Sequence, residues 1–486
     1  MMRIHARESI RFPVVALLSC ASFLFLYLYF DSVLLSFVIL ALGVTYLLLA
    51  HQEAGIYICL FSSMFFHPLD AQKIPVGGSN IRFLDILVVV FIIGWAIQFA
   101  QGKSKVPQDK QPRLLYLILA LLMFSLVRGV VRGHNLLTVL RDARAIAYYS
   151  FALAFASVLI KPNQLKRLVK YLMIFSVGTL AYYYLMRILN APFESGLSYV
   201  TLTSNRYIRS YGIYSSWPFF AFAFFMLVSR ITVMRPRGAV HILMLLLTGA
   251  FVYAILLLLM RTYFVGLVVG SIVLIVAFAL KKGRRSAIKL TVICAILSLV
   301  FVTIIGFVPD SNLRRHPFFE RYLSIFSPKV TTRAAAVTRQ DRIDAILYFQ
   351  KFQKGSSWLG TGLGEVQRDE QARFYLFHSS MGWALYRLGI LSTLVLYLIF
   401  GCYMLIALKR SLQIADPDLQ SIYYALLGFA AFLLALSPAS GVLFDKINEM
   451  ILLAFSMGGL MVIPAMDRQQ AIPHTLPLAA YDEKDI

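Results

Sequence analysis

Long apolar runs recur along this chain from one end to the other, and they restrict the folds open to it. Fourteen runs, most of 17 to 25 residues, alternate with polar segments. A helix of that length crosses about 30 Å of hydrocarbon and satisfies its own backbone polar groups there. With 59% hydrophobic and 14% charged residues in 486, the chain is too apolar for a water-soluble domain. We therefore expect an all-α, polytopic integral membrane protein with about 12–14 transmembrane helices and one large loop outside the membrane. The runs lie near 13–30, 32–50, 54–66, 83–100, 114–127, 136–160, 171–189, 212–229, 240–260, 262–280, 287–308, 381–407, 421–437 and 449–465.

The runs divide the chain into four parts. The N-terminal transmembrane part, 1–308, carries eleven runs, and the C-terminal transmembrane part, 381–465, carries three. Between them, 309–380 is the only segment long enough to be more than a connector, and loops of this length usually have a function. The polar, proline-containing cytoplasmic tail, 466–486, is expected to be disordered.

Short Lys/Arg-rich segments predict the orientation, because such segments remain on the cytoplasmic side. They occur at the N-terminus and at 103–113, 161–170, 230–237 and 281–289, and they alternate with the apolar runs as this rule requires. The loop 309–380 then faces the opposite, outer side.

Arginine is abundant on that opposite side. When each loop is counted with the helix ends that adjoin it, the 46 Lys+Arg divide into 23 on each side, and the outer 23 comprise 18 Arg and 5 Lys. A multi-pass protein usually concentrates its basic residues in cytoplasmic loops. The net charge of +23 belongs to no soluble basic domain, so nucleic acid is not expected as a partner. The outer arginines instead predict a site for a polyanion, with membrane lipids and a lipid-linked phosphate as partners.

Three groups of arginine are candidates for this site. Arg261 stands between two apolar runs, where its planar fork suits phosphate oxygens; the alternative is an anchor that reaches lipid headgroups. Arg206 and Arg209, with aromatic residues between and after them, suit a diphosphate beside a sugar ring, or else are ordinary interfacial charges. Arg144 lies at another outer helix end, where an ion pair of Asp142 with a neighbouring arginine is the structural alternative.

A glycine-rich segment lies near the end of the large loop. Gly360, Gly362 and Gly364 permit a sharp turn and a close approach between backbones. No strand precedes them and no Lys-Ser/Thr follows, which excludes a dinucleotide-binding or phosphate-loop fingerprint. His378 lies where the chain re-enters the membrane, in a position to act on a group held at the surface; a structural role is the alternative for a lone histidine.

Together these segments resemble the O-antigen ligase/polymerase family of bacterial membrane glycosyltransferases. The resemblance covers the hydropathy profile from about 80 to 465 and is sharpest at 339–390. Family members carry an arginine before an amphipathic helix, a Leu-Gly-x-Gly-x-Gly turn, a histidine near the next span, and a Gly-Ile pair within that span. The matching positions are Arg339 or Arg342, Leu359 to Gly364, His378 and Gly389-Ile390, together with Arg209-Ser-Tyr-Gly212 and Arg261 for two further arginine segments.

Two positions depart from the family pattern. The family histidine is commonly followed by asparagine, where this sequence has Ser379. An acidic residue often precedes the Gly-Ile pair, where this sequence has Arg387. The first difference bears on the surroundings of His378, and the second on contacts with the acceptor.

The resemblance implies a glycosyltransferase of the bacterial inner membrane with its active site facing the periplasm. Such an enzyme moves a glycan from an undecaprenyl-diphosphate-linked donor to a hydroxyl of an acceptor sugar. Arg209 and Arg261, with Arg206 and Arg144, would bind the diphosphate, and His378 would take the acceptor proton. Arg342 and the three glycines would support the loop. The outer segments show no Asp-x-Asp and no carboxylate/His cluster, so neither a metal site nor a cofactor is expected.

Two acceptors fit this chemistry. A polymerase of O-antigen or exopolysaccharide repeat units adds the glycan to another lipid-linked repeat, and an O-antigen ligase adds it to lipid A–core. The loop 309–380, with 11 Lys+Arg and 7 Asp+Glu, can face the phosphates of either. We expect polymerisation, because ligation requires one special acceptor, whereas an enzyme of this family can serve any surface polysaccharide. A chain-length regulator or other polysaccharide-assembly proteins are candidate partners. A polysaccharide or lipid transporter is the remote alternative, but no inverted repeat or broken midplane helix is evident.

Overall fold

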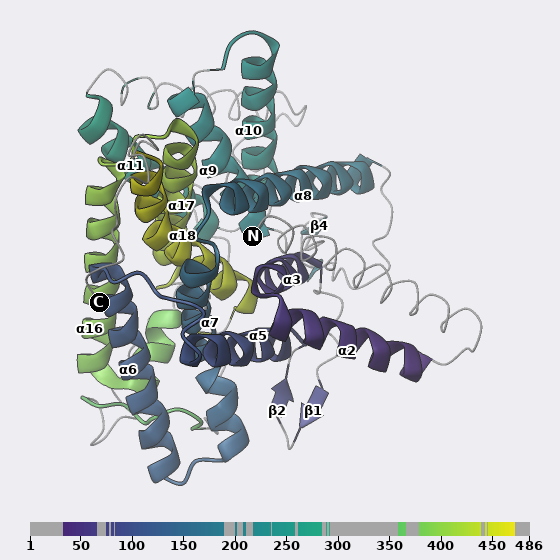
Figure 1. Ribbon diagram of the computed structural model, residues 1–486, viewed down its shortest axis with the longest axis vertical. Helices are drawn as coiled ribbons and strands as arrows, with labels where there is room; N and C mark the ends of the chain where they lie inside the picture. Colours follow the sequence, from purple (N-terminus) through teal and green to yellow (C-terminus); the bar gives the residue numbers. More distant parts are fainter. Residues whose placement is uncertain are drawn as a thin grey trace, which may run out of the picture.

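The computed structural model is a bundle of long α-helices with two short β-hairpins (Figure 1). It describes residues 33–65, 74–76, 79–81, 83–188, 200–201, 208–209, 217–234, 236–257, 261–283, 288, 291, 358–365, 379–438, 443–444 and 446–471. The helices are α2 (Val33–Ala50), α3 (Gln52–Phe65), α5 (Phe83–Ala100), α6 (Lys110–Val131), α7 (Leu136–Val158), α8 (Pro162–Ile188), α9 (Trp217–Met234), α10 (Ala239–Leu257), α11 (Arg261–Lys282), α16 (Ser380–Ser411), α17 (Pro417–Leu436) and α18 (Ile447–Ala471). Strands β1 (Ile74–Val76) and β2 (Ser79–Ile81) form one antiparallel hairpin, and β3 (Val200–Thr201) and β4 (Ile208–Arg209) form the other.

The helices coincide with the apolar runs, which confirms an all-α, polytopic membrane protein. Seven helices of the described part are long and apolar enough to cross a membrane, and two shorter apolar helices accompany them. Helix α16, for example, begins one residue before the predicted run 381–407, and α11 begins one residue before the run 262–280. The run 13–30 lies outside the described residues, as does nearly all of 287–308, so the total of 12–14 spans stays a prediction.

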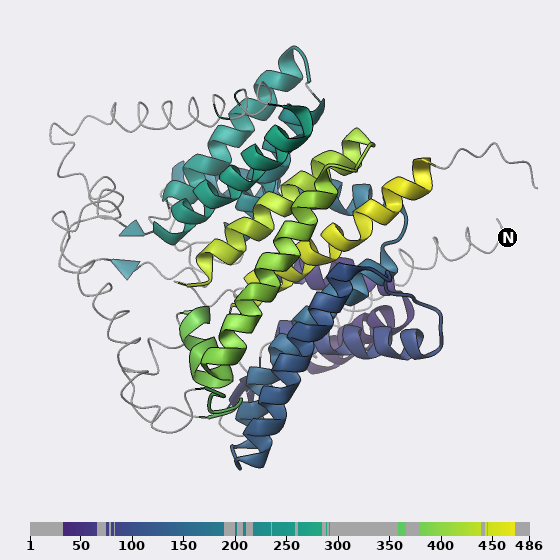
Figure 2. The same cartoon turned by 90° about the vertical axis from the view of Figure 1, so that its left-hand side faces the viewer.

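Three helices form the centre of the bundle. In the apolar stretches of α9, α17 and α18, 83%, 89% and 94% of the residues are buried inside the protein. The corresponding shares are only 28% in α6 and 33% in α8. Phenylalanine rings fill this centre. The ring centroid of Phe222 lies 5.7 Å from those of both Phe429 and Phe455. The outer helices instead expose apolar side chains, which suits contact with lipid. Figure 2 shows α6, α16, α17 and α11 running alongside one another in a common direction.

Segments predicted to lie on one side of the membrane gather at one end of the bundle. The predicted cytoplasmic end is formed by 101–109, 159–161 and 412–416, and its charges pair across helices. Arg410 Nη2 forms an ion pair with Asp109 Oδ1 at 2.8 Å. Lys166 Nζ forms ion pairs with the carboxylates of Asp416 and Asp418, at 3.3 and 3.2 Å. The predicted outer end is formed by 132–135 and 358–365, together with residues 437, 438, 443, 444 and 446.

Two helices run past the boundaries predicted from hydropathy. Helix α8 starts at Pro162, so most of the basic segment 161–170 is helical rather than a loop. Helix α18 continues to Ala471, beyond the predicted end of the membrane part at 465. The carboxylate of Asp467 accepts hydrogen bonds from the backbone N–H groups of Ala415 and Asp416, at 2.9 and 2.8 Å. This contact orders the first residues of the predicted tail.

Candidate functional site

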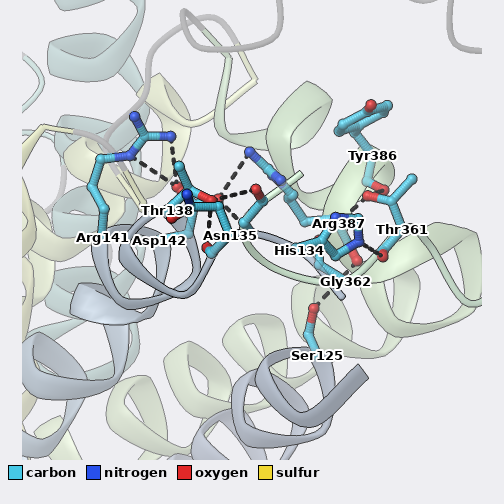
Figure 3. Close-up of polar contacts among 11 residues, drawn as sticks. Ser125, His134, Asn135, Thr138, Arg141, Asp142, Thr361, Gly362, Tyr386 and Arg387 are labelled. Atoms are coloured by element: carbon cyan, nitrogen blue, oxygen red, sulfur yellow. Dashed lines mark hydrogen bonds and ion pairs between the residues drawn. The ribbon is translucent and has the colours of Figure 1, made fainter. Parts of the chain in front are cut away.

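The glycine-rich segment packs at the predicted outer end as a tight turn, residues 358–365, called the glycine turn below (Figure 3). Gly360, Gly362 and Gly364 have φ angles of +69°, +88° and +89°, a region in which a side chain is strained. There is also no room for one. A Cβ at Gly360 would lie 2.4 Å from the carbonyl oxygen of Arg387, and a Cβ at Gly362 would lie 2.6 Å from the nitrogen of Gly129. The sharp turn and close backbone approach predicted from the glycines are both present.

A break in α16 explains why the turn binds there. Gly389, of the Gly-Ile pair, has φ +84° and ψ 173° and interrupts the helix. In an unbroken helix, the carbonyls of Tyr386 and Arg387 would accept from the N–H groups four residues later. Here they accept from the glycine turn instead, from the N–H groups of Thr361 and Gly362, each at 3.0 Å. The N–H of Leu391 in turn donates to the carbonyl of the turn's first residue at 3.3 Å.

A buried ion pair closes the other side of the turn. Arg387 Nη2 lies 2.8 Å from Asp142 Oδ2, and the two side chains are 2% and 4% exposed. The same carboxylate accepts a hydrogen bond from the N–H of Gly364 at 3.0 Å, and it forms a second ion pair, with Arg141, at 3.3 Å. A buried charge is tolerated when it is paired and hydrogen-bonded, and Asp142 meets that condition through three donors.

The ion-pair partners of Asp142 and Arg144 differ in part from those considered from the sequence. Asp142 was expected to pair with Arg141 or Arg144, and its shortest ion pair is with Arg387, on a different helix. Arg144 pairs instead with Asp85 at 3.9 Å. Arg387, expected to bear on acceptor contacts, is buried against Asp142 and holds the glycine turn.

The loop between α6 and α7 binds the carbonyl oxygens of the turn. Arg132 donates to the carbonyls of Gly360 and Thr361 at 3.4 and 3.3 Å, and His134 Nε2 lies 3.1 Å from the latter. Thr138 Oγ1 donates to the carbonyl of Gly364 at 2.6 Å. These contacts were missed from the sequence. The sequence did carry one indication of them: a polar loop on the predicted outer side leads directly into α7, and it ends at Asn135, which caps that helix.

The first turn of α16 accounts for the departure at Ser379. Its side chain caps the helix by accepting the N–H of Gly382 at 3.1 Å, and its hydroxyl donates to the carbonyl of Pro438 at 2.7 Å. Serine and asparagine are both preferred at this capping position. The serine therefore performs the capping that an asparagine would perform there, immediately after His378.

The remaining candidates divide by how far the structure describes them. His378, Arg206 and Arg342 lie outside the described residues. Arg209 is described as a strand residue paired with Val200, and Arg261 as the first residue of α11, without their side chains. Within the described part of the chain, no three His, Cys, Asp or Glu residues gather closely enough to hold a metal ion.

Replacing Arg387 with methionine should destabilise the protein by about 3 kcal/mol, because it leaves the buried carboxylate of Asp142 short of its closest cation. Thermal unfolding of the purified protein in detergent measures the change. Arg132→Met is the matched control: this arginine contacts the same turn but is exposed, so its loss should cost below about 1 kcal/mol. Equal losses for the two variants would contradict the assigned role of the buried pair.

No protein-family model matches the chain, and no curated protein matches its sequence. The resemblance to the O-antigen ligase/polymerase family therefore depends on the ordered sequence motifs alone.

Proposed function

We propose that this protein is a glycosyltransferase of the bacterial inner membrane that acts at the periplasmic face. It transfers a glycan from undecaprenyl diphosphate to an acceptor sugar hydroxyl, most simply to extend O-antigen or exopolysaccharide repeat units. The supporting observation is the docking of the Leu-Gly-x-Gly-x-Gly turn on the helix break at the Gly-Ile pair. Two separate motifs of the resemblance thus form one structure, at the end of the bundle that is predicted to face outward.

The proposed reaction is a single displacement at the anomeric carbon. The acceptor oxygen bonds to that carbon while the bond to the diphosphate oxygen breaks, and the diphosphate leaves with the electron pair. Arg209 and Arg261 stabilise the charge that develops on the diphosphate, assisted by Arg206 and Arg144. His378 takes the proton of the acceptor hydroxyl. Attack opposite an α-linked diphosphate inverts the anomeric configuration.

The position of Arg261 supports this assignment. It is the first residue of α11, an apolar helix that begins at the predicted outer end. A helix N-terminus carries a partial positive charge and free N–H groups, which favour an anion. Asp85 already partners Arg144 in the described structure. We therefore assign Arg144 an assisting role and Arg261 the main one.

Loss of the protein should change the cell's glycan profile in a diagnostic way. In a deletion strain, products limited to a single repeat indicate a polymerase, whereas unmodified lipid A–core with accumulated long lipid-linked chains indicates a ligase. The wild-type gene should restore the profile and His378→Ala should not, although the variant protein reaches the membrane in normal amount. Full restoration by His378→Ala would remove the histidine from the mechanism, and an unchanged profile in the deletion strain would contradict the function itself.

Substituting Arg261 with lysine tests geometry rather than charge. Lysine keeps the positive charge but loses the two parallel hydrogen bonds of a guanidinium to phosphate oxygens. Losing one charged hydrogen bond costs about 1.5–3 kcal/mol, so the transfer rate of the purified variant should fall roughly tenfold to a hundredfold. Arg314→Lys, in the large loop, serves as the control and should change little. Undiminished activity in Arg261→Lys would make this arginine a topological anchor.

Transfer should not depend on a divalent metal, since arginine supplies the positive charge in this mechanism. Purified protein, given donor lipid extracted from the deletion strain, should keep its rate in excess EDTA. The new glycosidic linkage is the readout, because a transporter would leave the glycan linkages unchanged. Activity that disappears in EDTA and returns with Mg²⁺ or Mn²⁺ would refute the metal-free mechanism.

A further inference from the structure

The segment that joins α17 to α18 contacts the start of two other helices. We call residues 437–449, which include the first three residues of α18, the C-terminal connector; residues 437, 438, 443, 444 and 446–449 of it are described. It contains none of the candidate site residues. Its contacts nevertheless reach the first turn of α16, next to His378, and the first turn of α11, which Arg261 opens.

Three hydrogen bonds join the beginning of the connector to α16. The N–H of Ser380 donates to the carbonyl of Ser437 at 3.0 Å, and the N–H of Leu443 donates to Ser380 Oγ at 2.9 Å. The hydroxyl of Ser379 donates to the carbonyl of Pro438 at 2.7 Å. Ser380 is fully buried, so its own N–H and hydroxyl groups would be costly to leave unpaired.

Ring stacking reinforces this junction. Trp383 and Phe444 stack with their ring centroids 4.2 Å apart and their planes 13° apart. Both side chains are buried. Tyr149, from α7, adds a hydrogen bond to the carbonyl of Leu443 at 3.4 Å. The connector therefore has a defined position relative to the residues that follow His378.

A buried carboxylate joins the other end of the connector to α11. Tyr263 Oη donates to Glu449 Oε1 at 2.8 Å, and Lys446 Nζ lies 3.4 Å from the same oxygen. Tyr263 and Glu449 are each 4% exposed. Because a buried carboxylate strongly favours a hydrogen-bond donor, this contact fixes the first turn of α11, two residues from Arg261.

We infer that the C-terminal connector, which is fixed against the first turn of α16, holds the diphosphate-binding arginine in position, with Tyr263 and Glu449 as positioning residues for Arg261. This inference rests on the proposed function. Holding reacting groups in the correct geometry contributes several kcal/mol to catalysis, and small displacements are costly. The two residues contact no substrate in this scheme; they act through the start of α11.

A double-mutant cycle separates positioning from simple packing. Tyr263→Phe removes the hydroxyl but keeps the ring, which packs 5.5 Å from Phe432. The transfer rate per folded protein should fall about tenfold, the effect of one hydrogen bond to a charged group. In an Arg261→Lys background, the same substitution should cost less than about twofold, because the geometry that it disturbs is already lost.

Two further variants complete the design. Glu449→Gln keeps an oxygen that can accept from Tyr263, so it should retain a rate within about threefold of wild type, whereas Glu449→Ala should lose as much as Tyr263→Phe. Tyr423→Phe is the matched control. It removes a buried tyrosine hydrogen bond of the same 2.8 Å length, to the carbonyl of Ala407, and should leave the rate unchanged.

The outcomes distinguish the inference from the function on which it rests. A large loss in Tyr263→Phe that disappears in the Arg261→Lys background supports the inference. An equal loss in both backgrounds, no loss, or an equal loss in Tyr423→Phe overturns it while Arg261 keeps its role. If Arg261→Lys alone has no effect, the proposed diphosphate binding fails, and the inference fails with it.

Discussion

Backbone hydrogen bonding in a low-dielectric environment is the constraint on which the outer end of this protein depends. Gly389 interrupts α16 and removes the helical partners of two carbonyl oxygens. In a membrane-spanning helix such groups need other donors, and here the glycine turn provides them. The turn could not approach closely enough if it carried side chains at its glycine positions. The helix break and the glycine turn are therefore complementary parts of one arrangement.

Buried carboxylates add to these backbone hydrogen bonds in joining the helices. The carboxylate of Asp142 connects three partners, namely Arg387, Arg141 and the N–H of Gly364, and so ties α7, α16 and the turn together. At the start of another helix pair, Tyr263 and Glu449 connect α11 to α18 through a second buried carboxylate. The arginine-rich outer end thus contains structural arginines, such as Arg387, as well as those that we assign to the donor diphosphate.

Much of the fold could be predicted from the sequence, because an apolar run long enough to cross a membrane has one stable backbone conformation there. The sharp turn at Gly360, Gly362 and Gly364 was also predictable, since only glycine readily adopts such φ angles. The partner of that turn was not, because it depends on the break at Gly389, which hydropathy does not reveal. The pairing of Asp142 with Arg387 likewise joins residues distant in sequence, whereas the expected partners were local. Ser379 looked like a departure from the family, yet capping depends on a short side-chain oxygen that serine and asparagine share.

The way in which the glycine turn is attached has a consequence for how such a protein can diversify. The turn is held largely through main-chain groups, which are the same whatever side chains the rest of the loop carries. Residues elsewhere in 309–380 can therefore change in size and charge without weakening the attachment of the turn. An attachment made of backbone groups leaves the other side chains of the loop free to vary.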